Sequence, residues 1–428
     1  MKNCIMFATI LLSSFILMSS CHQLSIEIID DPDTTVWEPL PLSDSLYREA
    51  INTIHRRANQ ISGIRWTALA DVPNNVNSFS KGVTIKGVPY SSVKELDKFV
   101  GHEVSFYTFL TAAQNPKSVL YTENVGQFPY KGVNCACYYG TVCSMTVNYV
   151  LGIDCPYQTD MYAGLPFIEE VVHQDVYHIR IGDILWKKGH VVLIEDIEYD
   201  DNNSISSVSI LESIGTSTKI KKHSLGDFIN AWNENSWVLY RYKDFGRIPL
   251  QDDISFLSSL TSDNNAFTFD GALCTNRGDK ASFRSGEDVI LNCIRPYNGE
   301  VVLYRDKELY QRVICNNEDV VLSNLPHGKY EVVLLNSEVA TSFEVIQTDT
   351  RVGIVNGYTY VSFESENGFP EYVVFCSEAG TRSHIHSISD VERSRGEVHL
   401  KMNKRNLFVK VFYRGEYGRV ANEMIRIL

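Results

Sequence analysis

The chain has 428 residues, of which 44% are hydrophobic and 21% are charged, so it is a globular protein of two to four domains. Its formal net charge of -13 and its pI near 5.4 argue against a broad basic surface. We therefore predict no nucleic-acid partner and no tight electrostatic binding to an anionic membrane surface.

The first residues are typical of a secretory signal. Lys2 precedes an apolar run over residues 5–18, which is too short to span a bilayer comfortably. The residues that end at Cys21 resemble a bacterial lipobox, which implies a lipid on Cys21 and membrane attachment through it. Ordinary cleavage or an uncleaved anchor is the alternative. Because His22 is not the Asp that retains lipoproteins in the inner membrane, we predict a cell-envelope protein with the outer membrane favoured.

Residues 22–43 are polar, acidic and contain proline, which is typical of a tether. After Ser43, a plausible N-cap, apolar residues recur at helical spacing and predict a helix over residues 44–61. Two further helices are predicted over residues 92–100 and 104–113.

A buried helix is predicted within residues 136–149. The small residues Gly140 and Thr141 lead into Cys143, and the apolar run that follows ends at Gly152. This pattern places Cys143 in the first turn of the helix.

The rest of the chain is predicted to be rich in strands. After the helix, strands are expected over residues 183–186, 189–197, 206–212 and 237–242, with a helix over residues 225–232. These elements predict an α+β domain over residues 44–248. Short alternating runs beyond it predict two all-β sandwich-like modules, over residues 249–348 and 349–428.

A thiol attacks a carbonyl carbon as the thiolate, which a helix N-terminus and a neighbouring histidine favour. Cys143 meets the first condition, and His190, which opens a strand after Gly189, is the candidate base. Glu212 lies on the following strand, where it could orient the imidazole. This chemistry needs no metal and no organic cofactor.

Other cysteines and histidines are weaker candidates. Cys135 and Cys137 lack a following helix and the second ligand pair of a zinc site, and Cys155 follows the helix and is expected to be structural. Three histidines are expected on loops or helix surfaces: His173, His178 and His223. Trp66 and Trp186 are expected either to line a groove or to pack in the core.

Together these segments resemble the NlpC/P60 and CHAP hydrolases, which are papain-like. The resemblance spans about residues 45–243 and rests on Gly87-Val88-Pro89-Tyr90, Cys143-Ser144, Gly182-Asp183-Ile184-Leu185 and Gly189-His190-Val191-Val192. It implies a papain-like fold, a hydrolase that cuts peptidoglycan amides, and an oxyanion contact from Tyr90. Glu212 matches the acidic third residue of the CHAP branch.

The sequence departs from this family at two places. Val142 and Met145 flank Cys143-Ser144, where the family often has Asp and Gly, and residues 91–139 form a long insertion. The insertion motivates a first alternative, a surface thiol protease or transferase that acts on proteins. A catalytically inactive surface binding lipoprotein is the second. In each case the β-modules would position the protein or bind a glycan or protein ligand.

Overall fold

The computed structural model describes residues 42–73, 79–91, 98–127, 137–250, 267–335, 339–377, 382–400 and 408–427. Cys21 and Cys135, together with the predicted signal peptide and nearly all of the tether, lie outside these residues. Among the helices that the structure describes, none is long and apolar enough to cross a bilayer.

The helices within the predicted α+β region largely follow the sequence pattern. They are α1 (Asp44–Gly63), α2 (Phe106–Ala113), α3 (Val119–Thr122), α4 (Cys143–Leu151) and α5 (Leu225–Asn235). The Ser43 hydroxyl accepts a hydrogen bond from the Leu46 amide and so caps α1, as predicted. Only residues 98–100 of the helix predicted over 92–100 are described, and there Phe99 and Val100 form β-bridges instead.

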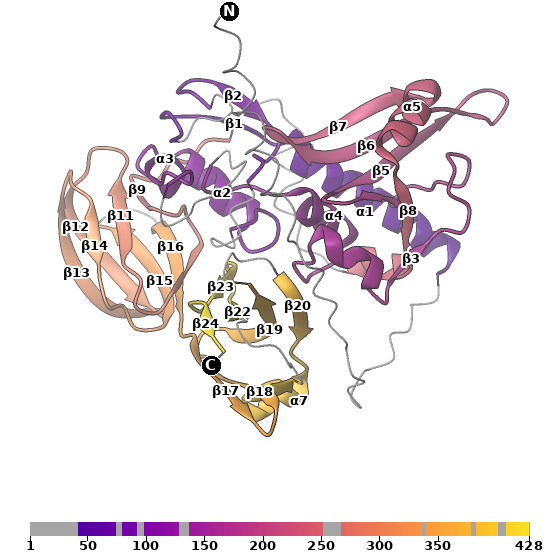
Figure 1. Cartoon of the computed structure of the whole chain (residues 1–428). Helices are drawn as coiled ribbons and strands as arrows, with labels where there is room; N and C mark the ends of the chain where they lie inside the picture. Colours follow the sequence, from indigo (N-terminus) through magenta and orange to yellow (C-terminus); the bar gives the residue numbers. More distant parts are fainter. Residues whose placement is uncertain are drawn as a thin grey trace, which may run out of the picture. The chain divides into compact units, whose positions relative to one another are not determined.

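A six-stranded antiparallel sheet forms the centre of this first, α+β module (Figure 1). Its strand order is β3-β8-β4-β5-β6-β7. The strands are β3 (Ile168–Glu170), β4 (Ile184–Lys187), β5 (His190–Tyr199), β6 (Ile205–Ile214), β7 (Ser217–Ser224) and β8 (Val238–Tyr242). Strand β7 has no counterpart in the predicted elements. A separate pair, β1 (Arg65–Thr67) and β2 (Thr84–Lys86), is also antiparallel.

The two faces of this sheet are covered by different helices. Val191, Leu193 and Leu211 belong to the core that also contains apolar residues of α1 and α4. Val192 and Ile210 instead join a second core with Phe228 and Trp232 of α5 and Leu239. Helix α5 accordingly lies on one side of the sheet, and α1 and α4 lie on the other (Figure 1).

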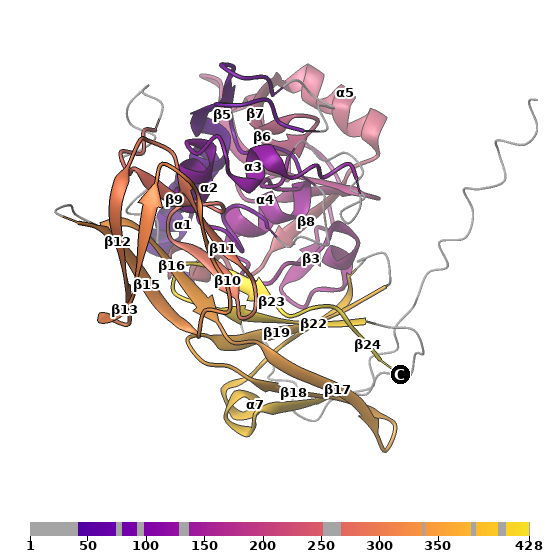
Figure 2. The same cartoon turned by 90° about the vertical axis from the view of Figure 1, so that its left-hand side faces the viewer.

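The second module is a β-sandwich (Figure 2). One sheet has the order β10-β16-β15-β12-β13 and the other β14-β11-β9, and residues of both sheets share one core. The strands are β9 (Leu273–Thr275), β10 (Ala281–Arg284), β11 (Val289–Cys293), β12 (Asn298–Arg305), β13 (Glu308–Asn316), β14 (Val320–Leu322), β15 (Gly328–Leu334) and β16 (Val339–Ile346).

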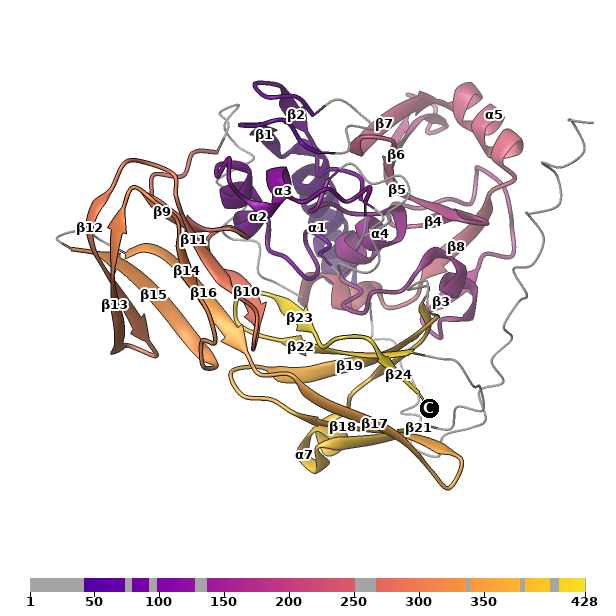
Figure 3. The same ribbon diagram turned by 60° about the vertical axis from the view of Figure 1, so that its left-hand side comes forward.

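The third module is also a sandwich of two sheets around one core (Figure 3). A three-stranded sheet, β17-β18-β21, faces a five-stranded one in which β20, β19, β22 and β23 are joined by β24. The strands are β17 (Asp349–Val355), β18 (Tyr358–Glu364), β19 (Phe369–Cys376), β20 (Arg382–Ser387), β21 (Glu397–Leu400), β22 (Phe408–Arg414), β23 (Arg419–Ala421) and β24 (Ile425–Arg426), with the short helix α7 (Asp390–Arg395). The predicted boundary at residue 348 falls between β16 and β17.

The described part of the 91–139 insertion binds the second module. Tyr107 on α2 donates a hydrogen bond to Asp279 Oδ2 at 2.7 Å, and Thr108 Oγ1 donates to the Lys280 carbonyl at 2.8 Å. Asn115, which follows α2, donates to Asn292 Oδ1 at 2.8 Å. These contacts give the insertion a structural role that does not depend on any substrate.

A buried arginine joins the third module to the first. The guanidinium of Arg419 is paired with Glu371 and, at 2.5 Å, with Asp154, and it donates to the His102 carbonyl at 2.6 Å. Only 2% of the Arg419 side chain is exposed. Because a buried charge that loses its partner typically costs about 3–5 kcal/mol, removal of a carboxylate from this cluster should destabilise the protein.

The contact between α2 and the second module predicts a severe effect of Gly278→Ala. A Cβ there would lie 2.2 Å from the Thr108 carbonyl oxygen, and the backbone already has a φ of +103°. We expect Gly278→Ala to lower the free energy of unfolding by at least about 2 kcal/mol more than Gly286→Ala, measured by chemical denaturation. Gly286 is the matched control because its φ is +86° but no atom lies within 4 Å of its Cβ position. Equal losses in the two variants would contradict this account.

Candidate active site

Cys143 is the first residue of α4, as the sequence predicts. Its N-cap residue, Val142, has an extended backbone and offers no side-chain cap, so the first amides of the helix are not satisfied by a capping side chain. Cys143 is 7% exposed, and its sulfur lies 3.5 Å from Thr159 Oγ1. A thiolate here would gain from the helix dipole.

The wall over the thiol comes from residues that follow α4. Thr159 begins a short 3-10 helix, η1 (Thr159–Gly164), and its carbonyl accepts a 2.9 Å hydrogen bond from the Trp186 indole. Tyr162 donates to Asn148 Oδ1 of α4 at 2.6 Å, which ties η1 to the helix. Trp186 therefore lies at the candidate site, whereas Trp66 is 1% exposed and lies in the core. Sequence reasoning missed Thr159 because no motif distinguishes it.

Tyr90 lies beside the segment that leads into α4. Its residue forms a parallel bridge with Thr141, and its amide donates to the Thr216 carbonyl at 2.9 Å. At the end of β6, Ser213 Oγ lies 3.5 Å from the Thr141 carbonyl. The start of α4, the Tyr90 segment and the β6–β7 turn thus meet at one end of the sheet.

His190 opens β5 at this same end, opposite Lys187 across a two-residue turn. Its imidazole lies 5.8 Å from the Trp237 ring, centroid to centroid. Burial lowers the pKa of His190, and the Glu212 carboxylate partly opposes this by raising it. Burial therefore favours the neutral form of the imidazole.

Glu212 lies on β6, 7% exposed, and forms an ion pair with Lys221 of β7. The register pairs Leu193 with Leu211, so Glu212 falls on the same face of the sheet as Val192. His190, two residues before Val192, shares that face. His190 and Glu212 therefore share one face of the sheet, and the Glu212 carboxylate raises the pKa of the imidazole.

The predicted contact between Cys143 and His190 is absent from the described hydrogen bonds and ion pairs. Side chains alternate along β5, so Val191 and Leu193 face α4 while His190 and Val192 face α5. Lys187, which is paired with His190 across the two strands, also lies on the α5 face, because its ammonium donates to Asn235 Oδ1 at the end of α5. The thiol and the imidazole lie on opposite faces of the sheet.

The other candidate residues have separate environments. Cys137 donates to the Tyr139 carbonyl at 2.8 Å, and the half-buried Cys155 lies 3.2 Å from Ser387 Oγ of the third module. His223 is a strand residue of β7 rather than a loop or helix residue, whereas His173 and His178 lie on the loop after β3.

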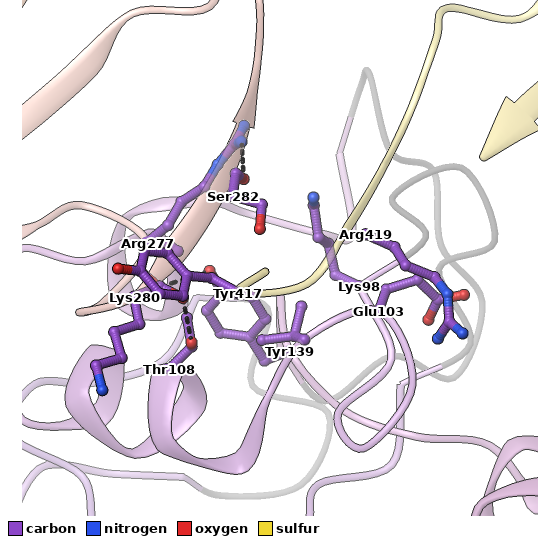
Figure 4. A pocket seen from close by; sticks show the side chains of 11 residues that line it. Lys98, Glu103, Thr108, Tyr139, Arg277, Lys280, Ser282, Tyr417 and Arg419 are labelled. Carbon is purple, nitrogen blue, oxygen red and sulfur yellow. Dashed lines mark hydrogen bonds between the residues drawn. The ribbon is translucent and has the colours of Figure 1, made fainter. Parts of the chain in front are cut away.

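A small pocket lies where the three modules meet, away from Cys143 (Figure 4). Lys98 and Tyr139 of the first module, Arg277 of the second and Arg419 of the third are among its lining residues. The space between these residues, open solvent included, is about 260 Å³, and a water-sized sphere fits at about one position within it. Its size suits a junction between modules rather than a substrate site.

Comparisons with known proteins found no matching family model and no matching curated protein. Solved structures with matching parts include the CD2-binding domain of CD58, at 9% identity and a TM-score of 0.20, covering 35% of this chain and 98% of that chain. Fibronectin(III)-like modules of Clostridium thermocellum CbhA match at 14% identity and a TM-score of 0.16, covering 35% of this chain and 89% of that chain. Alpha-2-macroglobulin from Escherichia coli, spanning domains MG0-NIE-MG1, matches at 10% identity and a TM-score of 0.17, covering 59% and 88%. Such low TM-scores carry no argument, and the two sandwiches are assigned from their sheet order and cores.

The surroundings of His190 predict opposite shifts of its pKa in two variants. Glu212→Gln should lower the pKa further because it removes the carboxylate that favours the imidazolium, whereas Lys187→Met should raise it because it removes a nearby positive charge. NMR titration of the imidazole would measure both shifts. Glu198→Gln, elsewhere on the sheet, is the control and should leave the pKa unchanged. A shift of the same sign in both variants would refute this placement of His190.

Proposed function

We propose that the first module is a thiol hydrolase of the bacterial cell envelope, in which Cys143 is the nucleophile. Its substrates would be amide bonds, most simply those of peptidoglycan stem peptides or crosslinks. The N-terminal lipid on Cys21 would hold the protein at the membrane, and the two sandwiches would position it or bind a glycan or protein.

The observation that carries this proposal is the position of Cys143 as the first residue of α4, a helix packed across β5 and β6. The Tyr90 segment is hydrogen-bonded to the strand end next to it, and His190 begins β5 at the same end of the sheet. This order of parts supports the resemblance to papain-like NlpC/P60 and CHAP hydrolases that the sequence motifs carry.

The proposed reaction is acyl transfer through a thioester. The Cys143 thiol gives its proton to His190 and its sulfur bonds to the amide carbon, while helix amides and Tyr90 stabilise the oxyanion. The C–N bond then breaks, and His190 protonates the leaving amine. Water, deprotonated by His190, attacks the thioester and releases the acid and the thiol. Glu212 shares the α5 face with His190 in the structure, where its carboxylate favours the imidazolium.

This chemistry places one requirement on the β4–β5 hairpin. Proton transfer needs the imidazole within about 2.6–3.2 Å of the sulfur, and His190 instead packs against Trp237 on the α5 face. The turn that precedes His190 would have to present the ring to the α4 face. Gly189 in that turn has a φ of +79° and open space around its Cβ position, so the turn has room to change.

A second candidate function is favoured by this same separation. If the two faces stay apart, Cys143 is a buried thiol under Thr159, and the module is a non-catalytic part of a surface binding lipoprotein. The protein-directed protease or transferase remains an alternative for the substrate only. This alternative rested on the 91–139 insertion, and the described part of the insertion binds the second module instead of forming a separate substrate surface.

A thiol-reactive probe at neutral pH tests the proposal on the full chain. We expect Cys143 to be labelled faster than Cys155, even though Cys155 is the more exposed of the two. Burial raises the pKa of the Cys155 thiol, so less of it is present as the reactive thiolate. His190→Gln should slow labelling of Cys143, and Cys143→Ala should abolish release of products from purified peptidoglycan. His190→Gln should also reduce hydrolysis by about 10²–10⁴-fold if it removes the general base.

Cys155→Ser is the control, because it removes a neighbouring thiol and should leave hydrolysis intact. Slower labelling of Cys143 than of Cys155, with identical digests from wild type and Cys143→Ala, would exclude catalysis and support the binding lipoprotein. Loss of protein cleavage in Cys143→Ala, with peptidoglycan untouched by the wild type, would keep the nucleophile and change the substrate.

A further inference from the structure

Three metal-ligating side chains converge on the loop between β3 and β4. Donor atoms of His173, Asp175 and His178 all lie within 4.8 Å of one another. The Asp175 carboxylate is 2.7 Å from His178 Nδ1, and the imidazoles of His173 and His178 stack with centroids 4.4 Å apart. The group is well separated in sequence from Cys143 and takes no part in the proposed thiol chemistry.

The backbone that carries these side chains is anchored to the sheet. The side chain of Gln174 binds the edge of β8, because its Nε2 donates to the Leu239 carbonyl at 3.1 Å and its Oε1 accepts from the Leu239 amide at 2.7 Å. Val176 is buried in the core under α5. Gln174 and Val176 thus fix the loop, while His173 and Asp175 remain at least partly exposed.

A tight turn over residues 175–178 places His178 beside Asp175. The Asp175 carboxylate accepts a 2.9 Å hydrogen bond from the Tyr177 amide, and the Asp175 carbonyl accepts one from the His178 amide at 3.3 Å. Arg241 donates to the His178 carbonyl at 3.0 Å and forms an ion pair with the buried Asp183. The far end of the loop is therefore tied to β8 as well.

We propose that His173, Asp175 and His178 bind one divalent transition-metal ion, of which zinc fits best. Two imidazole nitrogens and one carboxylate oxygen are ligands that zinc accepts, and three protein ligands leave a fourth position for water or an external ligand. Bonds of about 2.0–2.1 Å need donor atoms closer than 4.8 Å, so the side chains must draw together around the ion. All three are at least partly exposed and can rotate on a fixed backbone.

Thiols compete for zinc elsewhere in the chain and must be blocked in the test. Cys293 and Cys315 interact in the second module, where burial and the Cys293 thiol raise the pKa of Cys315. We therefore suggest equilibrium dialysis of the full, thiol-alkylated chain against zinc chloride, with the bound metal measured by atomic absorption.

The expected result is about one equivalent of zinc in the wild type. His173→Ala and His178→Ala should each weaken binding at least about tenfold, and Asp175→Asn should weaken it as well. His223→Ala, a histidine of β7 in the same module, is the matched control and should bind like the wild type. Circular dichroism would verify that each variant is folded, and His178→Gln replaces His178→Ala if the latter is not.

Cobalt substitution gives a second readout. Cobalt bound by three protein ligands and water should show visible absorption of a four-coordinate ion, and this absorption should vanish in the His173→Ala/His178→Ala double variant. Zinc binding that is equal in the wild type and this double variant would overturn the proposal, as would no binding to the wild type. Neither result bears on the Cys143 chemistry, because none of these ligands takes part in it.

Discussion

Alternation of side chains along β5 and β6 is the constraint on which the first module depends. Each strand presents successive residues to opposite faces, so one face packs against α1 and α4 and the other against α5. Both faces are apolar because both are covered, which explains the near-continuous apolar run from Val191 to Ile194. The same alternation decides which polar side chains can meet at the strand ends, and it places His190 with Glu212 rather than with Cys143.

The first module is joined to the other two by polar contacts of buried side chains, and to the third also by an apolar cluster. Arg419 pairs with Asp154 from the loop after α4, and this loop continues into Thr159, whose hydroxyl lies beside the Cys143 sulfur. Tyr372, Val374 and Phe412 of the third module pack near Tyr157 and Met161 on the same stretch of chain. The third module therefore packs against the same stretch of chain that covers the Cys143 thiol.

Two candidate sites of different chemistry result from this arrangement. Cys143 lies at the start of α4, with Thr159 Oγ1 beside its sulfur. His173, Asp175 and His178 lie on an anchored loop on the side of the sheet covered by α5, where Gln174 and Val176 hold the backbone. Stable positioning of both sites comes from the same six strands.

The sequence by itself determined the local elements with a strong period. Helix α1 with its Ser43 cap, Cys143 at the start of α4, the Gly152 end of that helix and His190 at the start of β5 all follow from local pattern. Only the tertiary structure decided on which face of the sheet His190 lies. A strand that is buried on both faces is apolar at successive positions, so its sequence shows no alternation of polar and apolar residues. It likewise decided that Thr159 covers the thiol and that His173 and His178 converge, since both depend on where a loop folds back. Sequence spacing fixes what lies near along the chain, whereas packing of the helices and modules fixes which side chains meet.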